Sequence, residues 1–431
     1  MCRVTMAPAE SPFLRLGPAC GRNVRAEALR RRFSYMRGAR ESVCQASEPD
    51  ARPRPATRPI PWHAPCSSPH VRQGSTASRH TFDDAPFIVF WETTQACDLV
   101  CKHCRANARP ARDPAELTFD EGTRLLDEVR AMGCPLVVLT GGDPAKRPDL
   151  VDLVRHGVDL GLRVALTPSA TPLVTPQLLA RLAAAGLTRL AVSLDGASAA
   201  SHDGFRGVAG SFARTLEILR DARAVGLTTQ VNTTVTDLNV DELETIADRL
   251  RTLEITLWGV FFLVPTGRGE ALRVLDPVAT ERVLERLVAI AGTAPFDVKT
   301  TAAPHFRRVL LQHQVKRREV AGIDDGIGRA PRGVNDGQGI VFVSHRGEVY
   351  PSGFLPVSCG SWRAEGLAAI YRDHPTFRVL RDADALGGKC GLCDFRRVCG
   401  GSRARAYAMT GDLLAEEPAC AYEPPATRSA S

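Results

Sequence analysis

Short apolar runs alternate with amphipathic segments from Phe87 onward. Apolar runs of this length between turn residues are typical of buried strands, and apolar positions three and four apart are typical of helices on a sheet. The predicted strands are Phe87–Trp91, Leu136–Leu139, Arg163–Leu166, Leu190–Ser193, Thr229–Thr233 and Leu257–Leu263. The helical segments between them include Thr123–Met132, Gln177–Ala185, Phe212–Val225 and Val240–Leu250, and three are followed by Gly133, Gly186 and Gly226 as helix stops.

Six βα units in series predict an α/β fold. Strands joined by crossover helices pair in parallel, and the loops after them gather at one edge of the sheet, where sites in such folds are built. We expect a partial (β/α)6, TIM-like barrel over residues 83–298 and a connection over 299–339. A hairpin of Ile340–Ser344 with Glu348–Tyr350 then opens a small Gly- and Cys-rich module over 340–425.

Residues 1–82 differ in composition from the rest, being rich in Arg, Pro, Ser and Ala without sustained periodicity. Such a segment buries too little apolar area to offset the entropy of ordering, so we predict a disordered extension. Its Arg-rich character resembles an organelle targeting peptide, while Met6 and Met36 leave open a start of translation further downstream.

The net charge of +7 is concentrated in this extension. Residues 1–80 hold fourteen Arg, no Lys and five acids, which gives +9 and leaves −2 for the remainder. The predicted folded part therefore lacks the basic balance that nucleic-acid binding favours. No apolar run approaches the roughly 18 residues of a membrane-spanning helix. Thirteen cysteines without a secretory apolar segment favour thiolate ligands in a reducing, cytoplasmic setting.

Three cysteines follow the first predicted strand within eight residues: Cys97, Cys101 and Cys104. Structural zinc sites usually collect four protein ligands, whereas three thiolates suit a [4Fe–4S] cluster with one iron left open. This Cys-x-x-x-Cys-x-x-Cys motif after a first βα strand resembles the signature of the radical S-adenosylmethionine (SAM) superfamily. The resemblance implies that the open iron binds SAM and that its cleavage gives a 5′-deoxyadenosyl radical. Buried or zinc-binding cysteines are the alternative.

The loops after later strands support this resemblance. Gly141-Gly142-Asp143 after the second strand is similar to the Gly-Gly-Glu motif of the superfamily, which binds the methionine amino group, with a carboxylate one methylene shorter. Two glycines let the backbone approach a ligand closely. By the same resemblance Ser193 and Asp195 after the fourth strand, and Asn232 on the fifth, are expected to contact the ribose or carboxylate of SAM.

A second cysteine group lies in the tail and consists of Cys390, Cys393, Cys399 and Cys420. It resembles the SPASM/twitch extension of radical SAM enzymes, although Arg403 stands where the full pattern has another cysteine. Four thiolates close a cluster completely, so one auxiliary [4Fe–4S] cluster is expected, and structural zinc is the alternative. The remaining cysteines are not assigned as ligands; Cys134 is expected in the core, and the role of Cys359 is open.

The resemblance to the SPASM/twitch group, which includes heme- and heme d1-forming enzymes, implies a radical SAM oxidoreductase that oxidatively modifies a tetrapyrrole or another small molecule. The SPASM/twitch group also includes peptide and protein maturases, which are the alternative, and a zinc-binding interaction protein is the non-enzymatic one. Residues 1–82 do not resemble the leader-binding module of several peptide maturases. A ferredoxin- or flavodoxin-type donor is expected to supply electrons. Lys299, His305, Arg307, Arg308, Arg403 and Arg405 are candidate substrate-gripping cations, and Tyr350 and Tyr407 are candidate hydrogen donors.

Overall fold

A single nine-stranded sheet organises the protein in the computed structural model, which describes residues 82–313 and 333–425. The strands follow the order β7-β6-β5-β4-β3-β2-β1-β8-β9. Their bounds are β1 (Ile88–Thr94), β2 (Leu136–Gly141), β3 (Arg163–Leu166), β4 (Arg189–Ser193), β5 (Thr229–Val235), β6 (Leu257–Phe262), β7 (Asp297–Thr301), β8 (Ile340–Val343) and β9 (Val349–Tyr350). All neighbours pair in parallel except the antiparallel pair β8 and β9. The predicted α/β fold with six βα units is confirmed.

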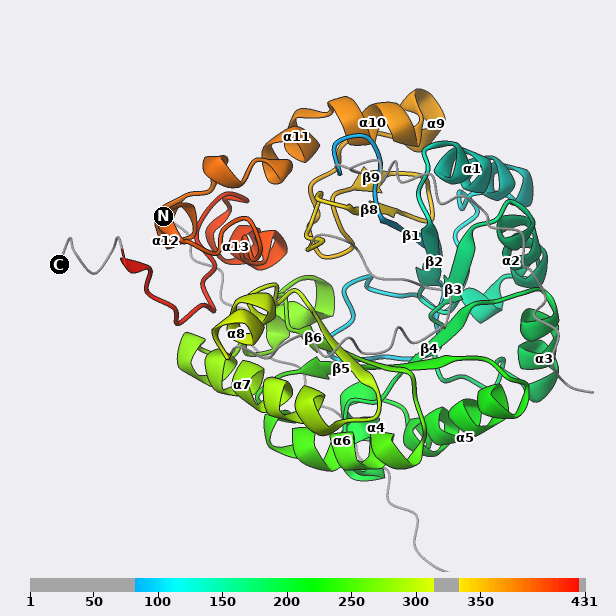
Figure 1. Ribbon diagram of the computed structural model, residues 1–431. Coiled ribbons are helices and arrows are strands. Elements are labelled where there is room, and N and C mark those ends of the chain that lie inside the picture. Colours follow the sequence, from blue (N-terminus) through cyan, green and yellow to red (C-terminus); the bar gives the residue numbers. More distant parts are fainter. Residues whose placement is uncertain (1–81, 314–332, 426–431) are drawn as a thin grey trace, which may run out of the picture. The chain divides into compact units, whose positions relative to one another are not determined.

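Helices cover the outer side of this curved sheet (Figure 1). Those between the strands are α1 (Phe119–Ala131), α2 (Leu150–Asp159), α3 (Pro176–Ala184), α4 (Ala199–Arg206), α5 (Ser211–Ala224), α6 (Leu243–Thr252), α7 (Pro277–Thr293) and α8 (Phe306–Gln312). The tail adds α9 (Trp362–Glu365), α10 (Leu367–Asp373), α11 (Pro375–Arg381), α12 (Gly388–Leu392) and α13 (Arg403–Thr410). Short 3-10 turns occupy η1 (Pro144–Lys146), η2 (Val240–Glu242), η3 (Gly267–Ala271) and η4 (Ala383–Ala385). Among the described helices, none is long and apolar enough to cross a membrane.

Alternation along each strand separates two layers of side chains. In β1, Val89 and Trp91 belong to the large core between the sheet and the helices, while Ile88 and Phe90 face the opposite, inner side. Local signals start and stop the helices around this core. Thr118 caps α1 in a capping box with Glu121, and Gly207 ends α4 in the left-handed region.

Two strands differ from the sequence expectation in informative ways. The predicted boundary at residue 298 falls inside β7, whose sequence Asp-Val-Lys-Thr-Thr has no apolar run to announce a strand. The predicted hairpin forms as β8 and β9, but β8 adds to the barrel sheet by pairing with β1. An otherwise unpaired edge of β1 offers backbone donors and acceptors that explain this docking. The predicted extension lies outside the described residues except for Phe82.

Candidate active site

The first three cysteines lie on one loop that leaves the C-terminal end of β1. The loop is tied at its base, because Cys97 N donates to the carbonyl of Arg109 at 2.7 Å and Arg109 N donates to that of Gln95 at 3.2 Å. Cys97 and Cys101 are buried, Cys104 is half-buried, and all three are unpaired thiols packed around Leu99. Burial raises the pKa of the Cys97 thiol, although Ser169 Oγ lies 3.2 Å from its sulfur.

Gly141 and Gly142 let the next loop pack directly on this one. A Cβ on Gly142 would lie 2.4 Å from the carbonyl oxygen of Ala96, and one on Gly141 would lie 2.3 Å from that of Thr94. Backbone bonds join the same segments, from Gly142 N to Thr94 O at 2.8 Å and from Asp143 N to Ala96 O at 2.6 Å. The glycines were predicted to admit a ligand. In the structure, they admit the backbone that leads into the cysteine loop.

The Asp143 carboxylate is fully buried and holds the loop after β3. It accepts hydrogen bonds from Thr171 Oγ1 at 2.6 Å, from Ala145 N at 3.1 Å and from Ser169 N at 3.3 Å. Burial raises the pKa of Asp143 above its ordinary value, although the three hydrogen-bond donors act to lower it. The carboxylate is therefore engaged by the protein itself, and its predicted contact with the methionine amino group stays a prediction.

Asp195 is also buried, and it pairs with Arg206 at the end of α4. Its Oδ2 lies 2.5 Å from Arg206 Nη2, and its Oδ1 accepts from Thr234 N at 2.7 Å. Burial opposes ionisation, but the Arg206 guanidinium holds the pKa of Asp195 below its ordinary value. Arg206 Nη1 in turn donates to Cys101 Sγ at 3.5 Å. The predicted ribose contact of Asp195 is untested, and the structure shows it orienting a cation against a cysteine of the first group.

Ser193 and Asn232 are in register on β4 and β5, and the row continues to Gly259 on β6. Asn232 Oδ1 accepts from Gln230 Nε2 at 2.7 Å and overlies Gly259, where a Cβ would approach it to 2.6 Å. The Ser193 hydroxyl has no partner among the described residues. Polar groups thus line the inner face of the sheet at β4 and β5.

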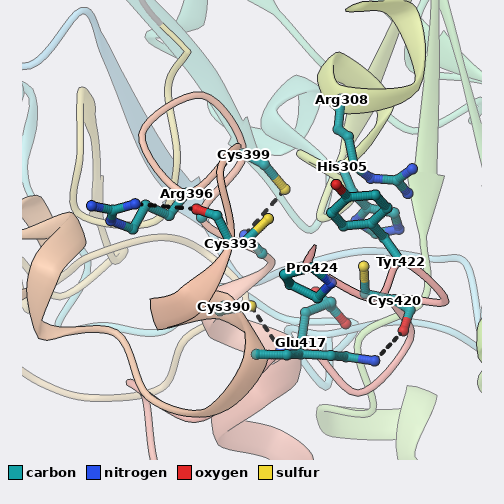
Figure 2. A pocket seen from close by; sticks show the side chains of 13 residues that line it. His305, Arg308, Cys390, Cys393, Arg396, Cys399, Glu417, Cys420, Tyr422 and Pro424 are labelled. Atoms are coloured by element: carbon teal, nitrogen blue, oxygen red, sulfur yellow. Dashed lines mark hydrogen bonds between the residues drawn. The ribbon is translucent and has the colours of Figure 1, made fainter. Parts of the chain in front are cut away.

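The four tail cysteines converge around one cavity, whose empty space, including its opening to solvent, is about 370 Å³ (Figure 2). Backbone N–H groups point at three of the sulfurs: Phe395 N lies 3.4 Å from Cys393 Sγ, Gly401 N lies 3.4 Å from Cys399 Sγ, and Glu417 N lies 3.3 Å from Cys390 Sγ. Burial raises the pKa of the Cys399 thiol to about 12, so its thiolate requires a compensating positive charge.

The four cysteines line one cavity, which suits a cluster. Within the described ranges, no three Cys, His, Asp or Glu side chains are arranged to hold a single metal ion. A [4Fe–4S] cluster takes one thiolate on each iron, so its ligands surround a volume. Arg308, Lys389 and Arg396 also line the cavity, and Arg403 Nη2 lies 3.8 Å from Cys390 Sγ. Such cations offset the charge of thiolate ligands.

Several predicted substrate-gripping residues serve other contacts. Arg403 and Arg405 are buried, and Arg405 pairs with Glu417 and donates to the carbonyl of Leu263 at the end of β6. Arg307 and Arg308 bond within the tail and α7–α8 region, to Val334 O and Glu281 respectively. Arg307 and Arg405 join the tail to the barrel side through Val398 O and Leu263 O, whereas Arg403 bonds to carbonyls within the tail. Because Arg403 and Arg405 are buried, the expectation that they grip substrate is wrong for these two.

His305 lies at the same cavity with both ring nitrogens buried and unpartnered within the described structure. Burial lowers its pKa to about 4, which keeps the ring neutral. Cys134 and Cys359 are buried away from the two cysteine groups, each donating to a nearby carbonyl. The core position predicted for Cys134 is confirmed.

Known proteins resemble both the sequence and the fold. The model of the radical SAM superfamily matches residues 91–250. An AdoMet-dependent heme synthase of Methanosarcina barkeri is 41% identical over 342 residues, which is 79% of this chain and 98% of the relative. The chain belongs to the radical SAM superfamily. A second AdoMet-dependent heme synthase, from Nitratidesulfovibrio vulgaris, is 39% identical and covers 78% of this chain and 92% of its own length.

More distant relatives of this radical SAM enzyme act on different substrates. They include an Fe-coproporphyrin III synthase of M. barkeri, 29% identical over 77% of this chain and 87% of the relative, and a PqqA peptide cyclase of Rhodopseudomonas palustris, 30% identical over 79% and 88%. The solved structure of Streptococcus suis SuiB bound to S-adenosylmethionine has a TM-score of 0.62 at 16% identity, covering 79% of this chain and 78% of SuiB. The predicted superfamily, enzyme class and use of SAM with a [4Fe–4S] cluster are thereby confirmed.

Sequence reasoning missed Arg206, Glu92 and His345 around the site. Arg206 lies four residues after His202 on α4, a spacing that shares one helix face, but nothing local says that this face meets Cys101. Glu92 lies on the inner face of β1, where its carboxylate meets His345 Nδ1 at 2.7 Å from 253 residues away. The sequence signal that could have identified Glu92 is the occurrence of an acidic residue within an otherwise apolar predicted strand.

Proposed function

We propose that this radical SAM enzyme is a heme synthase that acts on an iron tetrapyrrole. The observation that carries the proposal is the 41% identity to an AdoMet-dependent heme synthase across 98% of that relative. Two further relatives, the Fe-coproporphyrin III synthase and a pre-heme d1 synthase, have names that also refer to iron tetrapyrroles. We therefore assign a tetrapyrrole ahead of other small molecules as the substrate class.

The chemistry is an oxidative decarboxylation. Fe-coproporphyrin III carries four propionates, whereas heme carries two propionates and two vinyl groups. Each conversion removes one hydrogen atom, one electron and CO2 from a propionate and leaves a vinyl carbon–carbon double bond. When bound, the first cluster and SAM supply the 5′-deoxyadenosyl radical that takes up the hydrogen atom as 5′-deoxyadenosine.

The chain's own residues position these groups. Cys97, Cys101 and Cys104 would hold the first cluster on a loop fixed by its backbone bonds, and Arg206 would stabilise the Cys101 thiolate. The polar row of Ser193 and Asn232 beside that loop would hold the cofactor. Each of these contacts is a proposal supported by the location of the side chains at the C-terminal edge of the parallel sheet.

We further propose that Cys390, Cys393, Cys399 and Cys420 hold one auxiliary cluster that accepts the electron from the substrate. The N–H groups and cations around these sulfurs would stabilise the added negative charge. Replacing Cys393 and Cys399 with Ala should abolish heme formation while 5′-deoxyadenosine still appears. Heme formation at the wild-type rate by this double variant would contradict the role.

The partners and setting follow from the same chemistry. A ferredoxin- or flavodoxin-type protein would supply the single electrons, in a cytoplasmic compartment reducing enough to keep the thiols free. We propose no nucleic-acid partner, because the part of the chain after residue 80 carries a net charge of −2. We also propose that residues 83–298 form the SAM-binding barrel and 340–425 the auxiliary-cluster module.

The test is anaerobic reconstitution with iron and sulfide, followed by Fe-coproporphyrin III, SAM and a reductant. We expect heme, CO2 and 5′-deoxyadenosine, with one 5′-deoxyadenosine per vinyl group formed. Cys101→Ala should give none of the three. A protein that cleaves SAM but leaves Fe-coproporphyrin III unchanged would overturn the heme synthase assignment and retain the superfamily chemistry.

A peptide maturase is the second candidate, favoured by the 30% identity to a PqqA peptide cyclase. The lower identity of that relative makes it the weaker candidate. The peptide maturase assignment would be supported if the reconstituted enzyme modified a short precursor peptide and left Fe-coproporphyrin III unchanged.

A further inference from the structure

An aromatic lining covers the inner side of the sheet where β8 meets β1. Phe342 on β8 is in register with Phe90 on β1, and its ring centroid lies 6.2 Å from that of Tyr350 on β9. The loop after β9 brings Phe354 against Phe261 of β6, with ring centroids 6.2 Å apart. Except for Phe342 these rings are only partly buried. Aromatic faces from both sides of the barrel thus meet on one surface.

Arg105 joins this lining to the cysteine loop. It directly follows Cys104, and its guanidinium carbon lies 4.4 Å above the centroid of the Phe342 ring. Its Nη2 donates to Glu92 Oε1 at 3.2 Å, which is its one side-chain hydrogen bond among the described residues. A guanidinium has five N–H donors, so several stay available. At Gly353 a Cβ would lie 3.1 Å from Arg105 Nε and 3.2 Å from Phe342 Cδ2, so glycine lets the loop close on both.

Lys299 supplies a second cation beyond Phe261. It is in register with Gly259, while Phe261 is in register with Thr301, so Lys299 and Phe261 are diagonal neighbours on the inner face. Lys299 is exposed, and no hydrogen bond or ion pair involves it in the described part of the chain. Gly259 puts no side chain between Lys299 and Asn232. A charged amine is therefore presented beside the aromatic rings.

The acids near these two cations are engaged elsewhere, which leaves the cations a surplus of donors. Asp297, two residues before Lys299 on β7, has a partner of its own. Glu92 is shared between Arg105 and His345, and Asp195 is taken by Arg206. The Asp143 carboxylate accepts hydrogen bonds from Thr171 and from two backbone N–H groups. An anionic ligand with a flat apolar body would satisfy both the rings and the cations, because guanidinium and ammonium groups bind carboxylates and aromatic rings stack on planar faces.

We propose that this lining is the binding site for the tetrapyrrole substrate: the macrocycle lies against Phe261 and Phe354, with one propionate at Lys299 and another at Arg105, which is held in place on the buried Phe342 ring. The proposal rests on the heme synthase function above and specifies where its substrate binds. An anionic peptide would use the two cations without needing a planar apolar surface. The pair of contacting, partly exposed rings of Phe261 and Phe354 is the reason to favour the macrocycle.

The test is an absorbance titration of the reconstituted protein with Fe-coproporphyrin III, without SAM or reductant. Lys299→Met and Phe354→Ala should each weaken binding about tenfold or more, equivalent to about 1.4 kcal/mol. Lys299→Arg should keep most of the affinity. Arg155→Met, which removes an exposed cation from the outer helix α2, is the matched control and should bind as wild type does. Iron content after reconstitution should match wild type in all four variants, and SAM cleavage without substrate should be unchanged in Arg155→Met.

The tetramethyl ester of Fe-coproporphyrin III separates charge from stacking. It should bind wild type more weakly than Lys299→Met binds the free acid, because the ester loses the ionic contacts with both Lys299 and Arg105. Lys299→Met should weaken ester binding no further. Wild-type affinity for the acid in both Lys299→Met and Phe354→Ala would overturn the site while heme formation by wild type still supported the function. Failure of the wild-type enzyme to bind Fe-coproporphyrin III at all would overturn both.

Discussion

Arg206 donates a hydrogen bond from Nη1 to the sulfur of Cys101 across 3.5 Å. The same guanidinium forms an ion pair with Asp195, and the Asp195 carboxylate accepts a hydrogen bond from the backbone N–H of Thr234. Charge-assisted bonds of this kind are stronger than neutral ones and fix orientation. The pair therefore acts as a buried support for one thiolate of the first cysteine group.

Replacing Arg206 with Met should leave Asp195 buried without its partner and remove the donor to Cys101. We expect at least a tenfold fall in 5′-deoxyadenosine formation without substrate, together with lower iron and sulfide content after reconstitution. Arg206→Lys keeps the charge but not the two-pronged geometry, and should lie between wild type and Arg206→Met. Full cluster content and SAM cleavage in Arg206→Met would show that the pair is dispensable.

Gly142 offers a test of the contact between the first two loops. Gly142→Ala would drive a methyl group into the carbonyl oxygens of Ala96 and Gln95, at 2.4 and 2.6 Å. Overpacking of this kind costs about 1–3 kcal/mol, and the displaced loop carries Cys97. Thermal unfolding of the metal-free protein should show the loss of stability, and reconstitution should show reduced iron uptake.

Gly204→Ala is the matched control for that variant. Gly204 lies inside α4, and a Cβ there would meet no atom within 4 Å. Alanine in a helix interior stabilises by up to about 1 kcal/mol relative to glycine, so the sign of the effect should be opposite. Equal behaviour of the two variants would mean that the loop contact at Gly142 carries no strain.

The parallel barrel could be predicted from the sequence because its six strands are apolar runs separated by amphipathic helices. The strand β7 could not, since its inner face carries Lys299 and its composition is polar. Asp143 and Asp195 were correctly placed at strand ends, yet their actual partners are Thr171 in the loop after β3 and Arg206 at the end of α4. Long-range pairing of charges depends on how helices dock, which local patterns do not encode.

In the tail, too, some features could be predicted from the sequence and others could not. The spacing of its four cysteines predicted that they act together, and they surround one cavity. The roles of the arginines between them could not be read in the same way, because a buried Arg and an exposed Arg have identical local sequence signals. Arg405 illustrates this point, since its partner Glu417 and the carbonyl of Leu263 lie on separate segments.

The pair of Arg405 and Glu417 predicts a large effect on stability. Both side chains are about 1% exposed and 3.1 Å apart, and Glu417 Oε2 also accepts from Ser402 N at 2.6 Å. Glu417→Ala would leave the guanidinium buried and unpaired, which costs about 3–5 kcal/mol. Chemical denaturation of the metal-free protein measures this cost. The exposed pair Arg378 and Asp373 is the control, since Asp373→Asn should cost less than about 1 kcal/mol.

Lys299 predicts a pH dependence of substrate binding. Solvent reaches its amine, but the barrel walls displace much of the surrounding water, and this desolvation, with the nearby charge of Arg189, lowers the pKa of Lys299 to about 8. The amine is thus charged below about pH 8 and becomes neutral above it, well before an ordinary lysine would at 10.5. The charged groups around it are Arg189 on β4 and Asp297, which shares its face of β7.

The affinity of the wild-type enzyme for Fe-coproporphyrin III should therefore fall as pH rises from 7 to 9, toward the value of Lys299→Met. The substrate propionates stay ionised throughout this range, so the change reports the protein. Lys299→Arg should bind with a nearly constant affinity over the same interval, because guanidinium keeps its proton. Absorbance titrations at pH 7, 8 and 9 measure all three proteins. A parallel decline in Lys299→Arg would assign the titration to another group and remove Lys299 from the propionate contact.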